Sequence, residues 1–259
     1  MRIALSQVTS GTDPAANLDL VRAEVAAAAE AGARLLVLPE ATSCCFGVPL
    51  GPVAEPVDGP WARELERVAD DAGLTVVAGT FSPGTGGRVR NTLLARGAGV
   101  HQHYDKVHLF DAYGYAESDT VEAGERPVVL DVDGVGVGLS TCYDVRFPGL
   151  AAALADAGAQ VVVVAASWGD GPGKAEQWDL LTRARALDST SWVLACGQAR
   201  PVAPSGDAPT GIGRSRVVDP LGVVVAELGE GPGRLVVDLD LDRVRTVRAT
   251  LPVLRNRRF

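Results

Sequence analysis

The stretch from Val135 to Leu150 combines residue types that can do chemistry with a pattern that would present them. It places Cys142 directly after a short apolar run with glycines at positions 136 and 138, which is typical of a buried strand. A cysteine at a strand end can act as a nucleophile. The alternative is that Cys142 is a small buried hydrophobe, as most free cysteines are. Polar side chains crowd the residues after the cysteine: Tyr143, Asp144 and Arg146.

Two other apolar segments also end at charged side chains. Residues 35–39 precede Glu40, and the segment from Tyr104 to Phe110 carries Lys106. A thiol with an ordinary pKa of about 8.5 is mostly protonated at neutral pH, so an attacking cysteine needs a base or a nearby cation. A carboxylate and a lysine would meet that need beside Cys142. Each of them alone would be an ordinary solvated charge.

The elements that must position these side chains alternate between strands and helices. This alternation predicts α/β layers, with two sheets packed face to face and helices outside. No linker or charge block divides the chain, so we expect a single domain over residues 1–259. Strands are expected at 3–8, 34–38, 74–80, 91–96, 100–106, 128–132, 135–140, 160–165, 191–196, 214–218, 223–227 and 234–238. Helices are expected at 14–31, 61–72, 149–157, 175–188 and 241–249, with a loop over 111–125 and an extended tail.

Composition excludes several classes of function. The net charge of −8 and a pI near 4.9 argue against nucleic acid as a partner, because binding phosphates needs a basic surface. The longest apolar run, residues 159–168, is too short to span a membrane, and no secretory signal pattern is visible. The four cysteines, at 44, 45, 142 and 196, fit neither a zinc site nor a disulfide framework. We therefore expect the reducing cytoplasm, with no membrane, nucleic acid or metal partner.

Three motifs together resemble the nitrilase superfamily of carbon–nitrogen hydrolases: LPEAT at 38–42, KVHLFD at 106–111 and CYDVRFP at 142–148. Three later segments are similar to its amidase branch, which contains omega-amidases and amidases of deaminated glutathione: ARALD at 184–188, VVDPLG at 217–222 and LPVLRNRR at 251–258. The resemblance implies a four-layer α-β-β-α sandwich that works without a cofactor. It also implies a homodimer, with the tail from Leu251 to Phe259 lying either across the neighbouring subunit or on its own subunit.

The same resemblance implies a role for each motif residue. Cys142 would attack a small linear amide and form a thioester. Glu40 would take the thiol proton and pass it to the departing nitrogen. Lys106, with the backbone N–H of Tyr143, would hold the oxyanion of the tetrahedral intermediate. Glu117 would position the substrate or support the lysine.

Substrate preference depends on residues with two interpretations each. Arg146 would either grip a substrate carboxylate or pair with Asp144 and brace the turn. Trp168 would either face the pocket or pack in the core or in a dimer. Tyr143 and Asp144 stand where relatives that act on nitriles tend to have tryptophan and glutamate, so amides are favoured over nitriles. Arg214 stands where omega-amidase-like relatives usually have histidine, which leaves the substrate open.

The sequence also allows two other functions. Cys142 could work with His108 as a cysteine–histidine hydrolase, in which case the imidazole would lie within hydrogen-bond reach of the sulfur and Glu40 would not. The chain could also be a binding or scaffold protein that keeps the fold without catalysis. His101 and His103 share a strand face but lack further ligands at suitable spacing, so a metal site is not expected.

Overall fold

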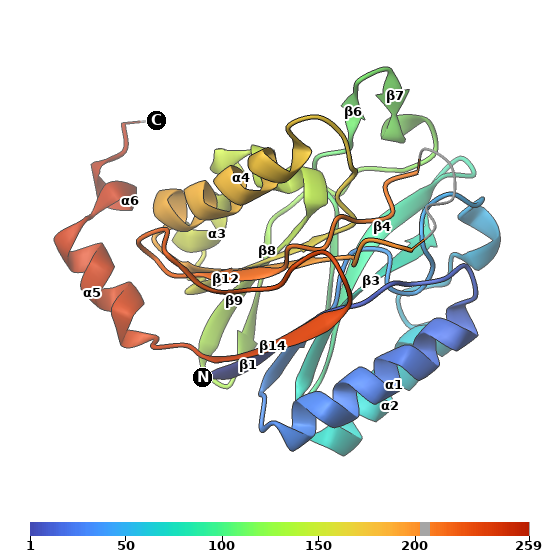
Figure 1. Ribbon diagram of the computed structural model, residues 1–259, viewed down its shortest axis with the longest axis horizontal. Coiled ribbons are helices and arrows are strands. Elements are labelled where there is room, and N and C mark those ends of the chain that lie inside the picture. Colours follow the sequence, from blue (N-terminus) through green and yellow to red (C-terminus); the bar gives the residue numbers. More distant parts are fainter. Residues whose placement is uncertain (203–207, 259) are drawn as a thin grey trace.

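The computed structural model describes residues 1–202 and 208–258, and its centre is a pair of six-stranded sheets packed face to face (Figure 1). The first sheet has the order β14-β1-β2-β3-β4-β5. Its parallel strands β1, β2 and β3 are continued on either side by antiparallel neighbours. The bounds are β1 (Arg2–Gln7), β2 (Leu35–Val37), β3 (Thr75–Pro83), β4 (Val89–Gly97), β5 (Val100–Asp105) and β14 (Gly233–Asp238).

The second sheet has the order β13-β12-β11-β10-β9-β8. Strands β9, β10 and β11 are parallel, and the outer strands are antiparallel to them. The two halves of the chain thus build similar sheets, as the repeated strand and helix pattern predicted. The bounds are β8 (Val128–Val132), β9 (Val135–Thr141), β10 (Val161–Ala166), β11 (Trp192–Gly197), β12 (Arg216–Val218) and β13 (Val224–Glu227).

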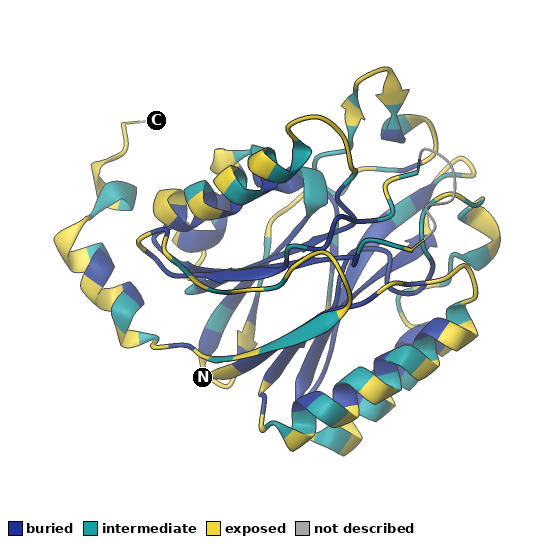
Figure 2. Ribbon diagram, in the orientation of Figure 1, coloured by how far each residue is buried: buried dark blue, intermediate teal, exposed yellow. Residues whose placement is uncertain are grey.

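Four helices cover the outer faces of the sheets. The apolar side chains of α1 (Pro14–Glu30) and α2 (Pro60–Ala72) pack on the first sheet, and those of α3 (Pro148–Asp156) and α4 (Lys174–Ser189) pack on the second. A third apolar cluster fills the space between the sheets, and the inner strands, such as β2, β10 and β11, are buried on both faces (Figure 2). The order of layers is therefore α-β-β-α, and the predicted fold class is confirmed.

Local sequence signals explain where these helices begin and end. The carboxylate of Asp13 accepts a hydrogen bond from the N–H of Ala15, and proline occupies the first turn of α1, α2 and α3. Both features satisfy or remove the free N–H groups of a first helical turn. Helix α2 ends at Gly73, whose φ of 67° is the left-handed conformation that glycine adopts without strain.

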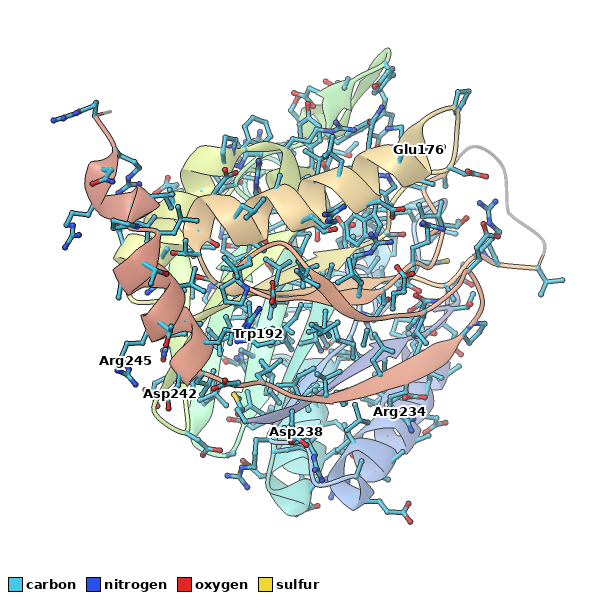
Figure 3. All side chains as sticks on the ribbon, turned by 60° about the vertical axis from the view of Figure 1, so that its left-hand side comes forward. Glu176, Trp192, Arg234, Asp238, Asp242 and Arg245 are labelled. Carbon is cyan, nitrogen blue, oxygen red and sulfur yellow. The ribbon has the colours of Figure 1, made fainter. Side chains whose placement is uncertain are left out.

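The last strand returns to the first sheet. Strand β14 pairs antiparallel with β1, and ion pairs join Arg2 to Asp238 and Arg234 to Glu24 of α1 (Figure 3). The chain then continues through α5 (Asp242–Thr250) and α6 (Val253–Asn256) along one side of the molecule. The tail that was expected to be extended thus contains a short helix.

Two more expectations need correction. The acidic segment that was read as a loop contains a small hairpin of β6 (Asp111–Ala112) and β7 (Tyr115–Ala116), followed by the 3-10 turn η2 (Glu117–Asp119). Strands of two residues are too short to show an alternating pattern, which is why the sequence did not reveal them. The strand expected from position 214 begins at Arg216. In the part of the chain that is described, no helix combines the length and apolar character needed to cross a bilayer.

Candidate active site

Three side chains at strand ends meet between the two sheets. Strands β2 and β5 run in the same direction, and Glu40 and Lys106 follow their carboxyl ends. Cys142 follows β9, and Ser167 follows the neighbouring strand β10. The N–H of Ser167 donates to Glu40 Oε2 at 2.6 Å, which joins the ends of strands from both sheets. The layered fold therefore brings residues from distant parts of the chain to one place.

Lys106 lies at the centre of this site between two carboxylates. Its Nζ is 3.3 Å from Glu40 Oε1, and it is 2.8 and 3.0 Å from the two oxygens of Glu117. All three residues are buried, with exposed fractions of 2%, 1% and 4% for Lys106, Glu40 and Glu117. Burying these charges is tolerable because each has a partner of opposite sign.

Glu40 is fixed from several directions. The side-chain amide of Asn91 donates to its Oε1 at 2.7 Å, and the amide of Gln198 donates to its backbone carbonyl at 3.0 Å. Gly79 on β3 passes so close that an added Cβ would lie 2.4 Å from the nitrogen of Ala41. The carboxylate is therefore held in place before any substrate arrives.

The charges of the site control its proton positions. Burial and the charge of Glu117 raise the pKa of Glu40 above its ordinary value, and Lys106 opposes them. Burial would lower the pKa of Lys106, but Glu40 and Glu117 outweigh it and raise that pKa, so the lysine stays an ammonium. Burial and the hydrogen-bonded carboxylate of Glu40 raise the pKa of the Cys142 thiol well above its ordinary value. The resting thiol is protonated, and its Sγ lies 4.0 Å from the carbonyl oxygen of Ser167, the residue whose N–H donates to Glu40.

Cys142 begins the 3-10 turn η3 (Cys142–Arg146) in a strained backbone conformation. Its φ is 47°, a region that residues with a side chain rarely adopt. Such strain is concentrated at functional sites, where surrounding structure holds it. The N–H of Tyr143 lies in the first turn of η3, and first-turn N–H groups lack a partner within the helix. That N–H adjoins the cysteine in the chain, and the charge of Cys142 acts on the ammonium of Lys106.

The interpretation of Asp144 as the partner of Arg146 is wrong. Its carboxylate accepts hydrogen bonds from the hydroxyl of Tyr104 at 2.6 Å and from the N–H of Thr141 at 2.8 Å. Asp144 is buried, and its hydrogen bond with Tyr104 joins η3 to the end of β5. Arg146 instead donates to the side-chain carbonyl of Gln177 on α4 at 2.5 Å.

His108 makes its hydrogen bonds to Asp144 rather than to the sulfur of Cys142. Its Nδ1 lies 2.7 Å from Asp144 Oδ1, and its backbone N–H donates to the same oxygen at 3.0 Å. Its ring stacks on Phe147 with centroids 3.7 Å apart. In the described residues the thiol hydrogen-bonds to Ser167, which also contacts Glu40, and not to the imidazole.

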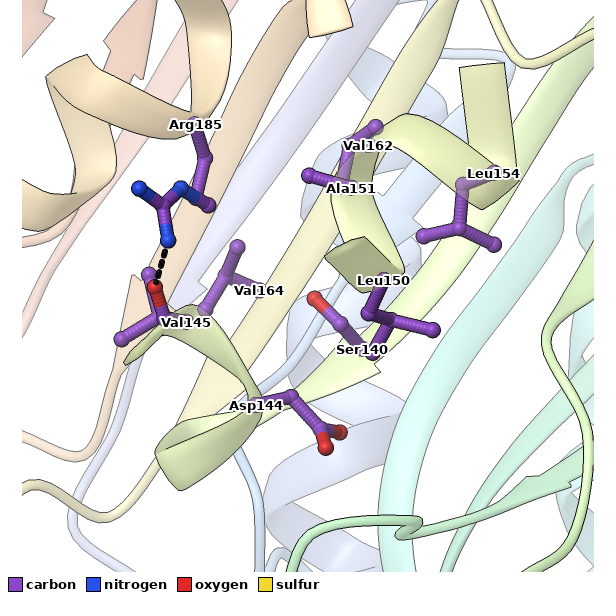
Figure 4. Close-up of a pocket in the computed structure, with 9 residues that line it drawn as sticks. All are labelled: Ser140, Asp144, Val145, Leu150, Ala151, Leu154, Val162, Val164 and Arg185. Atoms are coloured by element: carbon purple, nitrogen blue, oxygen red, sulfur yellow. Dashed lines mark hydrogen bonds between the residues drawn. The ribbon is translucent and has the colours of Figure 1, made fainter. Parts of the chain in front are cut away.

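A buried arginine hydrogen-bonds to the backbone of η3, the turn that begins at Cys142 (Figure 4). Arg185 on α4 donates from Nη1 to the carbonyl oxygen of Val145 at 2.9 Å, and its Nη2 lies 2.7 Å from Asp188. Beside it is a cavity of about 10 Å³, room for a single water molecule, lined by Ser140 and Asp144 among others. The guanidinium thus holds a backbone carbonyl of η3 in place.

The rim of the site is aromatic and cationic. The guanidinium of Arg146 lies 5.1 Å from the ring centroid of Trp168 and 5.9 Å from that of Tyr143. Trp168 is only 4% exposed and packs against Trp178 at 5.3 Å, so it belongs to the outer core and also supports the arginine. Arg214 pairs with Asp179 on α4, which places it on the helix side of the second sheet.

A family model described as carbon–nitrogen hydrolase matches residues 2–249 of the chain. The chain belongs to the carbon–nitrogen hydrolase family. This agrees with the nitrilase superfamily that the motifs predicted, and the protein is therefore a hydrolase of carbon–nitrogen bonds.

Relatives of this carbon–nitrogen hydrolase span its whole length. The chain is 57% identical to "Hydrolase MT0498" from Mycobacterium tuberculosis, over 99% of this chain and 95% of the relative. It is 39% identical to a deaminated glutathione amidase from Escherichia coli O157:H7, over 94% and 92% of the two chains. A solved structure of a mutant amidase from Nesterenkonia sp. AN1 has a TM-score of 0.80 at 33% identity, covering 97% and 98% of the chains. That structure shows Michael addition of acrylamide at the active-site cysteine.

Several contacts of this hydrolase's site were not predicted from the sequence. Asn91 and Gln198 hydrogen-bond to Glu40. Both are polar residues in or beside largely apolar strands, and a polar residue in such a place indicates a buried polar contact that the sequence could have revealed. The contact of Ser167 uses a backbone N–H, which leaves no trace in residue type. A second lysine, Lys174, lies at the rim, and the sequence analysis gave it no role.

The raised pKa of Glu40 predicts the pH dependence of this hydrolase. Below that pKa the carboxyl is protonated and cannot accept the thiol proton, so kcat/KM should fall on the acid side with an apparent pKa above 4.5. A pH–rate profile with a neutral amide measures this value. An increase in rate through the ordinary thiol pKa of about 8.5 would contradict the account, since the thiolate would then form without Glu40.

Proposed function

We propose that this hydrolase cleaves the C–N bond of a small linear amide through a thioester on Cys142, releasing ammonia and a carboxylate. The observation that carries the proposal is the buried lysine held between two carboxylates beside a protonated thiol. Such a cluster supplies a base, a cation and a nucleophile at one point. It has no evident structural purpose, because buried charges add little to stability.

The first half of the reaction uses each of these groups once. Glu40 accepts the proton of the Cys142 thiol while Sγ attacks the amide carbonyl carbon. The ammonium of Lys106 and the N–H of Tyr143 donate to the resulting oxyanion. Glu40 then gives the proton to the amide nitrogen, the C–N bond breaks, and ammonia leaves. The acyl group remains on Cys142 as a thioester.

The second half repeats these steps with water. Glu40 accepts a proton from the water molecule while its oxygen attacks the thioester carbonyl, and the same two donors hold the oxyanion. The C–S bond breaks, Cys142 recovers its proton, and the carboxylic acid product leaves as a carboxylate. Glu117 holds Lys106 in place throughout, because it accepts from Nζ with both oxygens. No cofactor takes part in this scheme.

The substrate is proposed to be a small amide that carries an acid group. The Escherichia coli relative is named for action on deaminated glutathione, and Arg146 lies beside Tyr143 at the rim, where it could bind a carboxylate. The ring of Trp168 packs against the guanidinium of Arg146. The reducing cytoplasm remains the proposed location, because it would keep the catalytic thiol free.

Ammonia release across a panel of substrates tests this function. The panel contains alpha-ketoglutaramate, deaminated glutathione, simple aliphatic amides and a nitrile. We expect release from amides, fastest from those with an acid group, and none from the nitrile. Release from the nitrile alone, or from no member of the panel, would contradict the proposed activity.

We also propose that the protein forms a homodimer. Exposed apolar side chains lie on α4, on the turn before β13 and on β13 itself, and they are Leu180, Leu187, Leu221, Val223 and Val225. Gly222 packs against Leu187, so the helix and the turn form one surface. For the tail we propose a place on its own subunit, because Arg257 pairs with Asp156 of the same chain at 2.5 Å; Phe259 falls outside the described residues. A second copy would cover the exposed apolar side chains.

Sedimentation measures this association. We expect a species of twice 26.8 kDa for the natural chain and a monomer for Leu180→Arg, because leucine 180 is 67% exposed and the change should not disturb the fold. A natural chain that sediments only at 26.8 kDa would end the proposal.

A further inference from the structure

Lys174, the first residue of α4, lies among aromatic rings at the rim of the site. Its Nζ is 4.6 Å from the ring centroid of Tyr113, 5.1 Å from that of Phe110 and 5.6 Å from that of Trp168. We call these three rings the Lys174 cage. An ammonium held against aromatic faces is stabilised by cation–π attraction, which leaves its N–H donors free on the open side.

Within residues 1–202 and 208–258, no hydrogen-bond acceptor or carboxylate pairs with the Lys174 ammonium. The two acidic residues nearest to Lys174 in the sequence do not pair with it. Asp170 pairs with Arg200 at 2.6 Å, and Glu176 is exposed on α4 (Figure 3). A cation that is partly shielded from water and has no acid beside it is ready to accept an anion from outside the protein.

A second cation, Arg146, increases the attraction of this site for an anion. The guanidinium of Arg146 lies over the same Trp168 ring that supports Lys174. Two cations over one ring repel each other, and burial and the charge of Arg146 lower the pKa of Lys174. An anion bound near them would relieve that repulsion.

The Lys174 cage is joined to the catalytic groups. The ring of Phe110 contacts that of Tyr143, next to the nucleophile, with centroids 5.0 Å apart. The N–H of Phe110 donates to Glu117 Oε2 at 2.6 Å, and Glu117 in turn holds Lys106. Phe110 therefore links the cage to the residue after Cys142 and to the partner of Lys106.

The composition of the chain singles out the same residue. Of 24 lysines and arginines, only two are lysines, and they are Lys106 and Lys174. Arginine thus serves at every other cationic position of this sequence. One of the two lysines lies between the catalytic carboxylates and the other at the rim beside them, where a compact ammonium on a flexible stem can reach an incoming group.

We propose that Lys174 binds a carboxylate at the end of the substrate remote from the scissile amide, and so selects acid amides over neutral amides of equal length. This inference rests on the proposed amidase function. Lys174 is a specificity-determining residue in this scheme, and it takes no part in proton transfer. The Lys174 cage orients its ammonium, and Arg146 adds to the positive potential that draws the acid group in.

The test compares two substrates of equal chain length, the monoamide of glutaric acid and pentanamide. For Lys174→Gln we expect kcat/KM on the acid amide to fall about tenfold to a hundredfold, mainly through KM, because a hydrogen bond to a charged group is lost. The value for pentanamide should not change. Lys174→Arg should keep most of the preference. Arg63→Gln on α2, which removes the same charge from an exposed position on the other side of the molecule, should change neither substrate.

A binding measurement in an inactive variant gives a second readout. In Cys142→Ala, glutarate should slow acetylation of Lys174, measured by peptide mapping, whereas pentanamide should not. An unchanged ratio of the two kcat/KM values in Lys174→Gln, an equal loss on both substrates, or no protection by glutarate would overturn the inference. If the natural enzyme hydrolyses neither substrate, the proposed amidase function itself fails, so the two failures are distinguishable.

Discussion

Cys142→Ala is expected to remove turnover of every amide while the protein stays folded. Without the sulfur no thioester forms, and Glu40 has no proton to move. The loss should be on the order of 10⁴-fold or more, the size seen when a nucleophile is deleted from a covalent hydrolase. Ammonia release measures the activity, and circular dichroism with thermal unfolding measures the fold.

Cys45→Ala is the matched control for this variant. That cysteine is also half-buried, and burial raises the pKa of its thiol too, but it lies outside the cluster of Glu40, Lys106 and Glu117. The control should retain the activity of the natural chain. Ammonia release by Cys142→Ala at an undiminished rate would refute the thioester mechanism.

Lys106→Met is expected to cost both activity and stability. Loss of the oxyanion donor should lower kcat by about 10²–10³-fold. The two carboxylates it leaves, Glu40 and Glu117, would remain buried without a cation, which typically costs about 3–5 kcal/mol. Steady-state kinetics and urea unfolding measure the two effects separately.

The stability loss in Lys106→Met should depend on pH in a defined direction. Burial already raises the pKa of Glu40, and without the ammonium the opposite charge that opposes that shift is gone, so the folded state takes up a proton as the pH falls. The difference in free energy of unfolding from the natural chain should therefore shrink towards acid pH and grow as the pH rises through that pKa. A loss of stability that is the same at every pH would show that the two carboxylates are not the cause.

Most of the architecture could be predicted from the sequence because its signals are local. Apolar runs mark the strands, and Asp13, Pro14 and Gly73 mark helix ends that the structure contains. The hairpin of β6 and β7 carries no such signal, because two residues cannot show a period. Pairing of β14 with β1 links the two ends of the chain, and nothing near residue 233 indicates that partner.

The site shows the same division between local and distant information. The motifs named Glu40, Lys106, Glu117 and Cys142, and the structure places all four together. Asp144 was misassigned because Arg146 is its neighbour in sequence, whereas two of its hydrogen-bonding partners, Tyr104 and His108, come from the segment at the end of β5. Spacing along the chain could not indicate a contact that forms only when the two sheets meet.

The most direct test of the central claim is to capture the acyl-enzyme. The natural enzyme is mixed with a saturating acid amide, quenched in acid within a single turnover, and mapped by mass spectrometry. The account predicts the acyl mass on the peptide that carries Cys142, labile to hydroxylamine, with one ammonia released for each acyl group bound. Turnover that proceeds with no acyl group on Cys142, or with the label on Cys44, Cys45 or Cys196, would contradict it.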